Sequence, residues 1–232
     1  MRIWDISPGY LNRQSLLGEH RELHGIVSII RGNKKGYSKH PETLRWVGYG
    51  WALKQRHKLL ATEMNLRGYV DRSPVLLRSK PEVWPENYID SPANQIMLLR
   101  KKYKTLEYGR IPLPRNAQQL WAQHKYSVMA RDISAYKELG KWVTSKSGSK
   151  ELSDVALEVT MLLRKPPEPR LIENTLLHMW GYVSKCASTS GKELGSLSMK
   201  ALLSKIQQLS LANNVKYLTE STSLSELDAW AI

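Results

Sequence analysis

Glu22 has the clearest capacity for chemistry in this sequence because of its setting on a predicted helix. At helical spacing it shares a face with Ser15, Gly18 and Gly25, whose small side chains leave space over the carboxylate. Two glycines inside a helix cost about 1 kcal/mol each relative to alanine, and close approach of a ligand is one reason to keep them. An ordinary surface glutamate beside an arginine has the same pattern, and spacing alone favours that simpler interpretation.

The second reactive group is the α-amine at the start of the chain. Methionine is removed only before a small residue and Arg2 is large, so we expect Met1 to be retained. An α-amine ordinarily has a pKa of about 8, and the charge of Arg2 favours its neutral, nucleophilic form. An amine with a carboxylate partner can attack an electrophilic sugar carbon and form a Schiff base. Met1 and Glu22 are therefore the candidate catalytic pair.

Positive charge is concentrated in the first half of the chain. Residues 1–115 hold 21 basic and 10 acidic side chains, a surplus of 11, whereas residues 116–232 hold 14 and 11, a surplus of 3. Such an asymmetry favours a surface that binds a polyanion, although a solvated basic face is the alternative. With no long apolar stretch, no secretory signal and Cys186 as the single cysteine, we expect a cytoplasmic protein without a membrane partner.

Helix signals dominate both halves, so we predict an all-α protein. In the first half, helices are expected from Asn12 to a stop at Gly32, from Trp51 to a stop at Gly68, and from the cap at Ser91 into the basic run 100–104. The glycine-rich stretches between them, which are expected to be loops, cover 32–41 and 46–51.

The second half is expected to hold four helices. A glycine and two prolines in YGRIPLPRNA (108–117) mark the boundary between a module at 1–115 and one at 116–232. The expected helices of the second module cover 117–143, 150–164, 170–186 and 198–213, and their separators are 144–149, 165–169 and 187–198.

The first module resembles a known family at several points. The segment MRI…RQSLLGEHREL resembles the pyrimidine-dimer DNA glycosylases of the phage endonuclease V type and their bacterial relatives. The spacing from the chain start to Gln14 and to the Arg-Glu pair is shared. The segments KQRHKLLATEMNLRGY (54–69) and ENYIDSPANQ (86–95) are similar to that family's second helix and the start of its third, so the resemblance covers about residues 1–105. The chain departs from the family at Ser15, where the family has a histidine, and at Gly25, where it has an arginine.

The resemblance implies a DNA repair enzyme that needs no cofactor. In that family the N-terminal amine attacks the anomeric carbon of a UV-induced pyrimidine dimer, an imine forms, the base leaves, and β-elimination cuts the strand on the 3′ side. The glutamate at the Glu22 position assists proton transfers. Arginines at the Arg2 and Arg21 positions bind phosphates, and Gln14 occupies a position that contacts DNA.

Further DNA contacts are expected from residue types alone. Basic side chains of the first module can follow the phosphates of a duplex, and aromatic side chains of its loops can stack on a displaced base or fill the core instead. The basic residues are Arg31, Lys34, Lys35, Lys39, Lys54, Lys58, Arg100, Lys101 and Lys104, and the aromatic ones are Trp46, Tyr49 and Trp51.

His20 and His24 stand one helical turn apart and could bind a metal, but no third ligand is evident, so no metal site is predicted. The second module resembles an uncharacterised bacterial helical domain that occurs fused to other modules. No catalytic group stands out in it, and its candidates are interpreted as packing or surface residues: His124, His178, Glu138 and Glu173.

We predict a monomer whose partners are double-stranded DNA with damaged pyrimidines and a protein that binds the second module. Two alternatives to dimer repair stay open. One is a non-catalytic nucleic-acid-binding or scaffold protein. The other is a glycosylase or lyase for other base lesions or for abasic sites.

Overall fold

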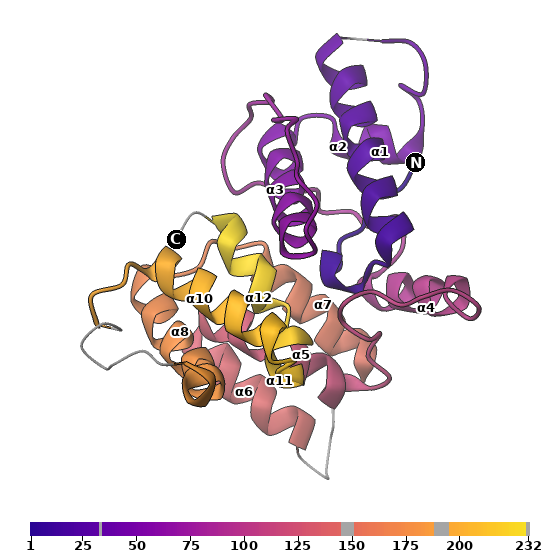
Figure 1. The fold of residues 1–232 in the computed structure, drawn as a ribbon. Coiled ribbons are helices and arrows are strands. Elements are labelled where there is room, and N and C mark those ends of the chain that lie inside the picture. The colour runs from indigo at the N-terminus through magenta and orange to yellow at the C-terminus, as the bar shows by residue number, and fades with distance from the viewer. Residues whose placement is uncertain (33, 145–150, 188–194, 231–232) are drawn as a thin grey trace.

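The protein is all-helical, as its sequence predicts. A computed structural model describes residues 1–32, 34–144, 151–187 and 195–230, and in these ranges it has eleven α-helices, three short 3-10 helices and no strand. Helices α1 (Arg13–Gly32), α2 (Pro41–Trp46) and α3 (Gly50–Leu66) form the upper part of Figure 1. Helix α4 (Pro92–Lys102) lies to one side, and the later helices gather below.

The caps predicted for the first three long helices are present. The Asn12 side chain accepts a hydrogen bond from the Ser15 N–H at 2.9 Å and starts α1 after the 3-10 turn η1 (Pro8–Tyr10). Gly68 follows α3 with φ of 82°, the left-handed conformation that favours glycine after a helix. The Ser91 hydroxyl caps α4, with Pro92 at its first position.

One helix was not predicted. Helix α2 occupies Pro41–Trp46, between the two stretches expected to be loops, and α3 begins at Gly50, one residue before its predicted start and inside the second stretch. The cap of α2 is the ring of His40, whose Nδ1 accepts from the Glu42 N–H at 3.1 Å. Histidine is not among the side chains that commonly cap a helix, so this start carries a weak sequence signal.

The helix predicted at 117–143 is two helices. Helix α5 (Ala117–Met129) ends before a turn, and α6 (Ile133–Thr144) starts after it. No glycine or proline marks the break, but the Asp132 carboxylate accepts hydrogen bonds from the N–H groups of Ser134 and Ala135, both at 2.9 Å. An aspartate that caps a new helix explains why the chain turns here.

The remaining helices follow the prediction closely. They are α7 (Leu152–Leu163), α8 (Pro169–Val183), η2 (Ser184–Cys186) and α10 (Met199–Ala212). Three short elements after them were not predicted: α11 (Lys216–Thr219), α12 (Ser223–Glu226) and η3 (Leu227–Trp230). The separators predicted at 144–149 and 187–198 lie largely outside the described residues.

The apolar core continues across the predicted module boundary. One buried cluster joins side chains of α1, α3 and α4, such as Leu23 and Leu60, to Val155 and Val159 of α7. A second cluster lies between α5, α8 and α10 and contains Leu176. The boundary between modules 1–115 and 116–232 therefore stays a prediction from the sequence. In the structure, side chains from both modules share one core.

Hydrogen bonds from a buried ion-pair network of the first half also reach the second half. The Glu63 carboxylate of α3 is fully buried and binds Arg110 at 2.6 Å and Arg67 at 2.7 Å. These arginines hold the pKa of Glu63 low, at about 2, against the effect of burial. Arg110 also donates to the carbonyls of Thr219 and Ser221. The segment between the halves is therefore fixed to both of them.

The boundary segment 108–117 packs so closely on the turn before α1 that position 109 must be a glycine. A Cβ at that position would lie 2.5 Å from the carbonyl group of Tyr10, closer than any side chain allows. The next contact of the segment is the hydrogen bond from the Ile111 N–H to the Gly9 carbonyl at 2.9 Å. The boundary segment thus packs directly on the turn before α1.

Among the described residues, no helix has the length and apolar character that crossing a membrane requires.

Candidate active site at the chain start

The first residues run along α1 and are held there by two of its glutamates. The backbone N–H of Arg2 donates to Glu22 Oε2 at 2.5 Å, and the N–H of Trp4 donates to Glu19 Oε1 at 3.0 Å. Alternate N–H groups of an extended chain point the same way, and residues three apart on a helix are neighbours. This match in spacing places the chain start against α1.

The chain start therefore lies beside Glu22, as the pairing of Met1 with Glu22 requires. The α-nitrogen of Met1 is separated from the Arg2 nitrogen only by the Cα and carbonyl carbon of Met1. Among the described residues, the Met1 amine forms no ion pair. Glu22 has no cationic partner there either, because its one hydrogen bond comes from the backbone N–H of Arg2 and not from the guanidinium. Both groups are half-buried and are free of other structural roles.

Glu19, which the sequence analysis overlooked, has the opposite environment. Its carboxylate is fully buried and receives two hydrogen bonds from Arg56, at 2.7 and 2.8 Å. Burial raises the pKa of Glu19 more than Arg56 lowers it. Glu19 lies between Leu16 and Leu23 at helical spacing, so its place on the apolar stripe was a signal that it would be buried.

The space predicted over Glu22 exists, but only part of it comes from the expected residues. A Cβ placed on Gly18 or Gly25 would meet nothing within 4 Å. Ser15, in contrast, is buried, and its hydroxyl accepts from Lys102 Nζ at 3.0 Å. Ser15 therefore closes one end of the face, and we call Gly18, Glu22 and Gly25 the open face of α1.

Two predicted DNA contacts flank the open face. Gln14 and Arg21 are exposed and are seven residues apart, so both project on the same side as Gly18 and Gly25. Arg21 Nε donates to the Leu17 carbonyl at 3.2 Å, which leaves its terminal nitrogens available. These positions fit a role in holding a phosphate beside the carboxylate.

Arg2, the third predicted DNA contact near Glu22, already has a partner for its guanidinium. Its guanidinium binds Asp90 at 2.5 Å and lies 5.0 Å from the ring of Trp4. Asp90 also lines a surface hollow beside three of the predicted DNA contacts on and after α4, which are Arg100, Lys101 and Lys104. Through Asp90, Arg2 is thus connected to the hollow that these three cations line.

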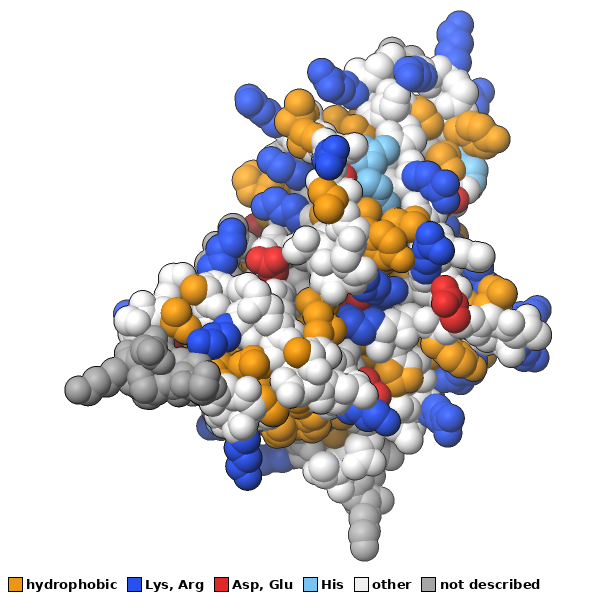
Figure 2. Space-filling view, viewed as in Figure 1, with side chains coloured by type: hydrophobic (Ala, Val, Ile, Leu, Met, Phe, Trp, Pro, Cys, Tyr) orange, Lys and Arg blue, Asp and Glu red, His pale blue; other side chains and the backbone are white. Residues whose placement is uncertain are grey.

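The other predicted cations are spread over the first module. Figure 2 shows Lys and Arg side chains spread over the visible face of its upper part, with few acidic ones between them. Arg31, Lys34 and Lys35 are exposed at the end of α1 and just after it. Lys54 and the half-buried Lys58 belong to α3, which packs against another side of α1, so the structure does not bring them to the open face.

The aromatic residues expected to stack on a displaced base are used in packing. Trp46 is 1% exposed and donates to Glu42 Oε1 at 2.9 Å, so it is a core residue. Trp51 packs against Trp84 and Trp230, with ring centroids 6.0 and 6.3 Å apart. For these two residues the packing interpretation is correct.

The second half shows no comparable site among its described residues. His124 is buried and its Nδ1 lies 2.9 Å from the Leu120 carbonyl, as a packing residue. Glu138 of α6 and Glu173 and His178 of α8 are exposed. Their interpretation as packing or surface residues is confirmed.

Comparison with known proteins assigns each part of the chain to a different family. Residues 1–77, which contain Met1, Glu19 and Glu22, match the family "Pyrimidine dimer DNA glycosylase". This part of the chain is therefore similar to pyrimidine dimer DNA glycosylases. Residues 125–226 match the family "Protein of unknown function (DUF1722)". No curated protein and no solved structure gives a significant match.

Proposed function

We propose that the protein is a pyrimidine dimer DNA glycosylase with AP lyase activity, in which the Met1 α-amine is the nucleophile and Glu22 transfers protons. The family match of residues 1–77 supports the class of enzyme. The observation that carries the mechanism is the hydrogen bond from the Arg2 N–H to Glu22, which puts the amine next to an unpaired carboxylate.

The proposed reaction begins at C1′ of the damaged nucleotide. The neutral amine attacks C1′ as the bond from C1′ to the base nitrogen breaks, and the base takes up a proton. Opening of the sugar ring at O4′ gives an imine between Met1 and C1′. Loss of a C2′ proton then expels the 3′ phosphate, and water hydrolyses the imine to restore the amine. Glu22 is close enough to the amine to carry protons in these steps.

Binding is proposed to depend on charge and on the deformability of the damaged duplex. A dimer weakens stacking, so the helix kinks there at low cost and a protein can recognise that property without reading the sequence. Gln14 and Arg21 flank the open face, and Arg100, Lys101 and Lys104 line one surface hollow. The four cations would contact phosphates on the two sides of the lesion, and the Gln14 amide could donate a hydrogen bond to one.

The test is strand cutting by the untagged full chain on three duplexes of one sequence. The first has one thymine dimer, the second one abasic site, and the third no damage. Cutting on the 3′ side of the attacked nucleotide of the dimer, with the undamaged duplex intact, is the expected result. Cutting of the abasic duplex alone would retain the lyase and reject dimer repair, and binding without cutting of any duplex would favour the non-catalytic alternative.

A further inference from the structure

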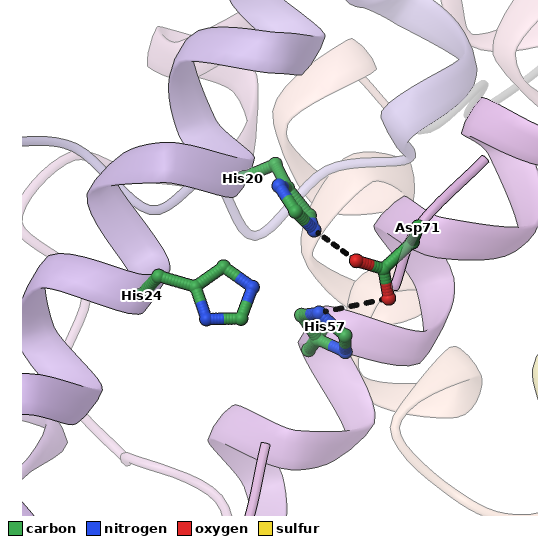
Figure 3. A group of neighbouring side chains, drawn as sticks. All are labelled: His20, His24, His57 and Asp71. Atoms are coloured by element: carbon green, nitrogen blue, oxygen red, sulfur yellow. Dashed lines mark hydrogen bonds and ion pairs between the residues drawn. The ribbon is translucent and has the colours of Figure 1, made fainter. Parts of the chain in front are cut away.

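Four possible metal ligands meet between α1, α3 and the segment that follows α3. His20 and His24 project from consecutive turns of α1, His57 from α3, and Asp71 from the extended segment (Figure 3). One ligand atom from each residue can be chosen so that all four lie within 4.8 Å of one another. The sequence showed only two of these ligands as a pair, because the other two are far away along the chain.

The spacing of the four groups suits a small divalent ion. His20 Nε2 lies 3.2 Å from Asp71 Oδ1, and His57 Nε2 lies 3.4 Å from Asp71 Oδ2. A tetrahedral zinc ion with bonds of about 2.0–2.2 Å places its ligand atoms roughly 3.3–3.5 Å apart. Two contacts already have this spacing, and small rotations of the side chains would bring in the third imidazole.

Two of the imidazoles have nitrogen atoms that packing alone does not explain. His24 Nε2 and His57 Nε2 are buried, and neither has a hydrogen-bond partner among the described residues. The His57 side chain is only 6% exposed, and Figure 3 shows this nitrogen directed toward Asp71. A buried polar atom without a partner costs about 1–3 kcal/mol, which a bound metal would offset.

The protonation state of the cluster also suits a cation. Burial, aided by the neighbouring His24 and His20 and opposed by Asp71, lowers the pKa of His57 to about 4. Burial and His20 lower the pKa of His24 in the same direction. Both shifts favour the neutral imidazole, the form in which histidine binds a metal.

We propose that His20, His24, His57 and Asp71 bind one divalent transition-metal ion of the zinc class. Three imidazoles and one carboxylate favour zinc, cobalt or nickel over magnesium or calcium, which prefer oxygen ligands. Four protein ligands complete a tetrahedral shell, as in structural zinc sites.

The ion has a structural role, because it lies on the other side of α1 from Glu22. Glu22 is two residues from His20 and two from His24, so at about 100° per residue it is turned roughly 200° away from both. The ion ties α1 to α3 and to the segment at Asp71, and it holds the helix that carries Glu22. It takes no part in the reaction proposed above.

The test uses the untagged full chain after a chelator has removed any bound metal. Zinc is titrated into it in a calorimeter, which measures the heat of binding, and thermal unfolding is then measured at several zinc concentrations. We expect one ion per chain and a rise in Tm that grows with free zinc. Cobalt in place of zinc should give the strong visible absorption of a tetrahedral site.

Two variants remove ligands without breaking a hydrogen bond to a residue outside the cluster. His24→Leu deletes a nitrogen that has no partner, so the metal-free variant should be at least as stable as the wild type. Asp71→Asn keeps the oxygen that accepts from the Ser73 N–H. Each should lower zinc affinity by more than the roughly 10- to 100-fold that loss of an outer-shell partner costs.

His178→Leu is the matched control, because His178 is exposed on α8, and it should bind zinc like the wild type. The proposal is overturned if the stripped wild type takes up no zinc, or if His24→Leu binds it as tightly as the wild type does. Neither outcome depends on DNA cutting, so the test is independent of the proposed enzymatic function.

Discussion

The open face of α1 and its buried side each present a glutamate to the chain start, but in opposite conditions. Glu19 on the buried side is fully enclosed and bound by Arg56, whereas Glu22 on the open face is half-buried and has only a backbone partner. A buried carboxylate that neutralises a buried cation cannot be removed alone without leaving that cation unpaired, and it cannot exchange protons freely. Two glutamates one turn apart thus differ in burial and in partners, and the proposed function gives the chemical role to Glu22.

Removing the Glu22 carboxylate should have the largest effect, on catalysis alone. Because Glu22 touches only one backbone N–H, Glu22→Gln should leave the free energy of unfolding within about 0.5 kcal/mol of the wild type. Its rate of dimer cutting should fall by about 10²- to 10⁴-fold, the usual contribution of a proton-transferring group. Single-turnover cutting with DNA binding measured in parallel checks this, and a variant that cuts at the wild-type rate would remove Glu22 from the mechanism.

Breaking the buried pair should give the converse result. Glu19→Gln leaves the Arg56 guanidinium buried without a counter-charge, and we expect a loss of about 3–5 kcal/mol in the free energy of unfolding. Urea unfolding measures this loss. The double variant Glu19→Leu with Arg56→Met should recover much of it, since neither charge is then left alone. If Glu19→Gln cost no more than Glu22→Gln does, the two carboxylates would not differ in the way described.

The difference between the two glutamates was only partly predictable from sequence. Glycines at helical spacing around Glu22 predicted the open face, and caps at Asn12 and Ser91 predicted where α1 and α4 begin. Arg56 lies far from Glu19 along the chain, so their pairing depends on how α1 and α3 pack. Local sequence patterns predict where a single helix begins and ends. Contacts between helices, such as that of Glu19 with Arg56, depend on how all the helices pack together.

The same reasoning explains the other failures. The cap of α2 is a histidine ring, and the break before α6 depends on Asp132 in a sequence without glycine or proline. His57 and Asp71 join His20 and His24 only in three dimensions. Ser15 looked like part of the open space, but Lys102 of α4 reaches over to bind it.

Acid should weaken the packing of the chain start through His124, which lies against Tyr10. Burial lowers the pKa of His124 to about 4, whereas an unfolded histidine titrates near 6.5. Between these values the unfolded chain binds more protons, so the stability present above about pH 6.5 is lost as the pH falls toward 4. The loss from this residue is roughly 3 kcal/mol at most.

Unfolding at a series of pH values, with chelator present, measures the effect of His124. His124→Gln keeps a polar side chain but cannot titrate, so its stability should fall less steeply than that of the wild type over this range. His178→Gln, at an exposed position, should follow the wild type. Parallel curves for all three proteins would show that His124 is not the group responsible.

Filling the open face should have the smallest effect on stability and a selective effect on cutting. Gly25→Ala places a methyl group where nothing lies within 4 Å, so it should raise the free energy of unfolding by about 0.5–1 kcal/mol. The methyl group would occupy space beside Glu22 that we assign to DNA, so dimer cutting should weaken.

Gly181→Ala is the matched control for this variant. Gly181 also lies inside a helix, with nothing within 4 Å of a Cβ, but in α8 of the second half. It should give the same gain in stability with unchanged cutting. Equal cutting by both variants would show that the space over Glu22 is not used by the substrate.

The most direct measurement is the capture of the proposed imine with borohydride. Untagged protein is mixed with a duplex that contains one thymine dimer, and the adduct is digested and mapped by mass spectrometry, which also shows whether Met1 is the first residue. The account predicts a covalent bond between the DNA sugar and the α-nitrogen of Met1, lost when that amine is acetylated. An adduct on a lysine, or cutting of the dimer strand with no adduct at all, would contradict it.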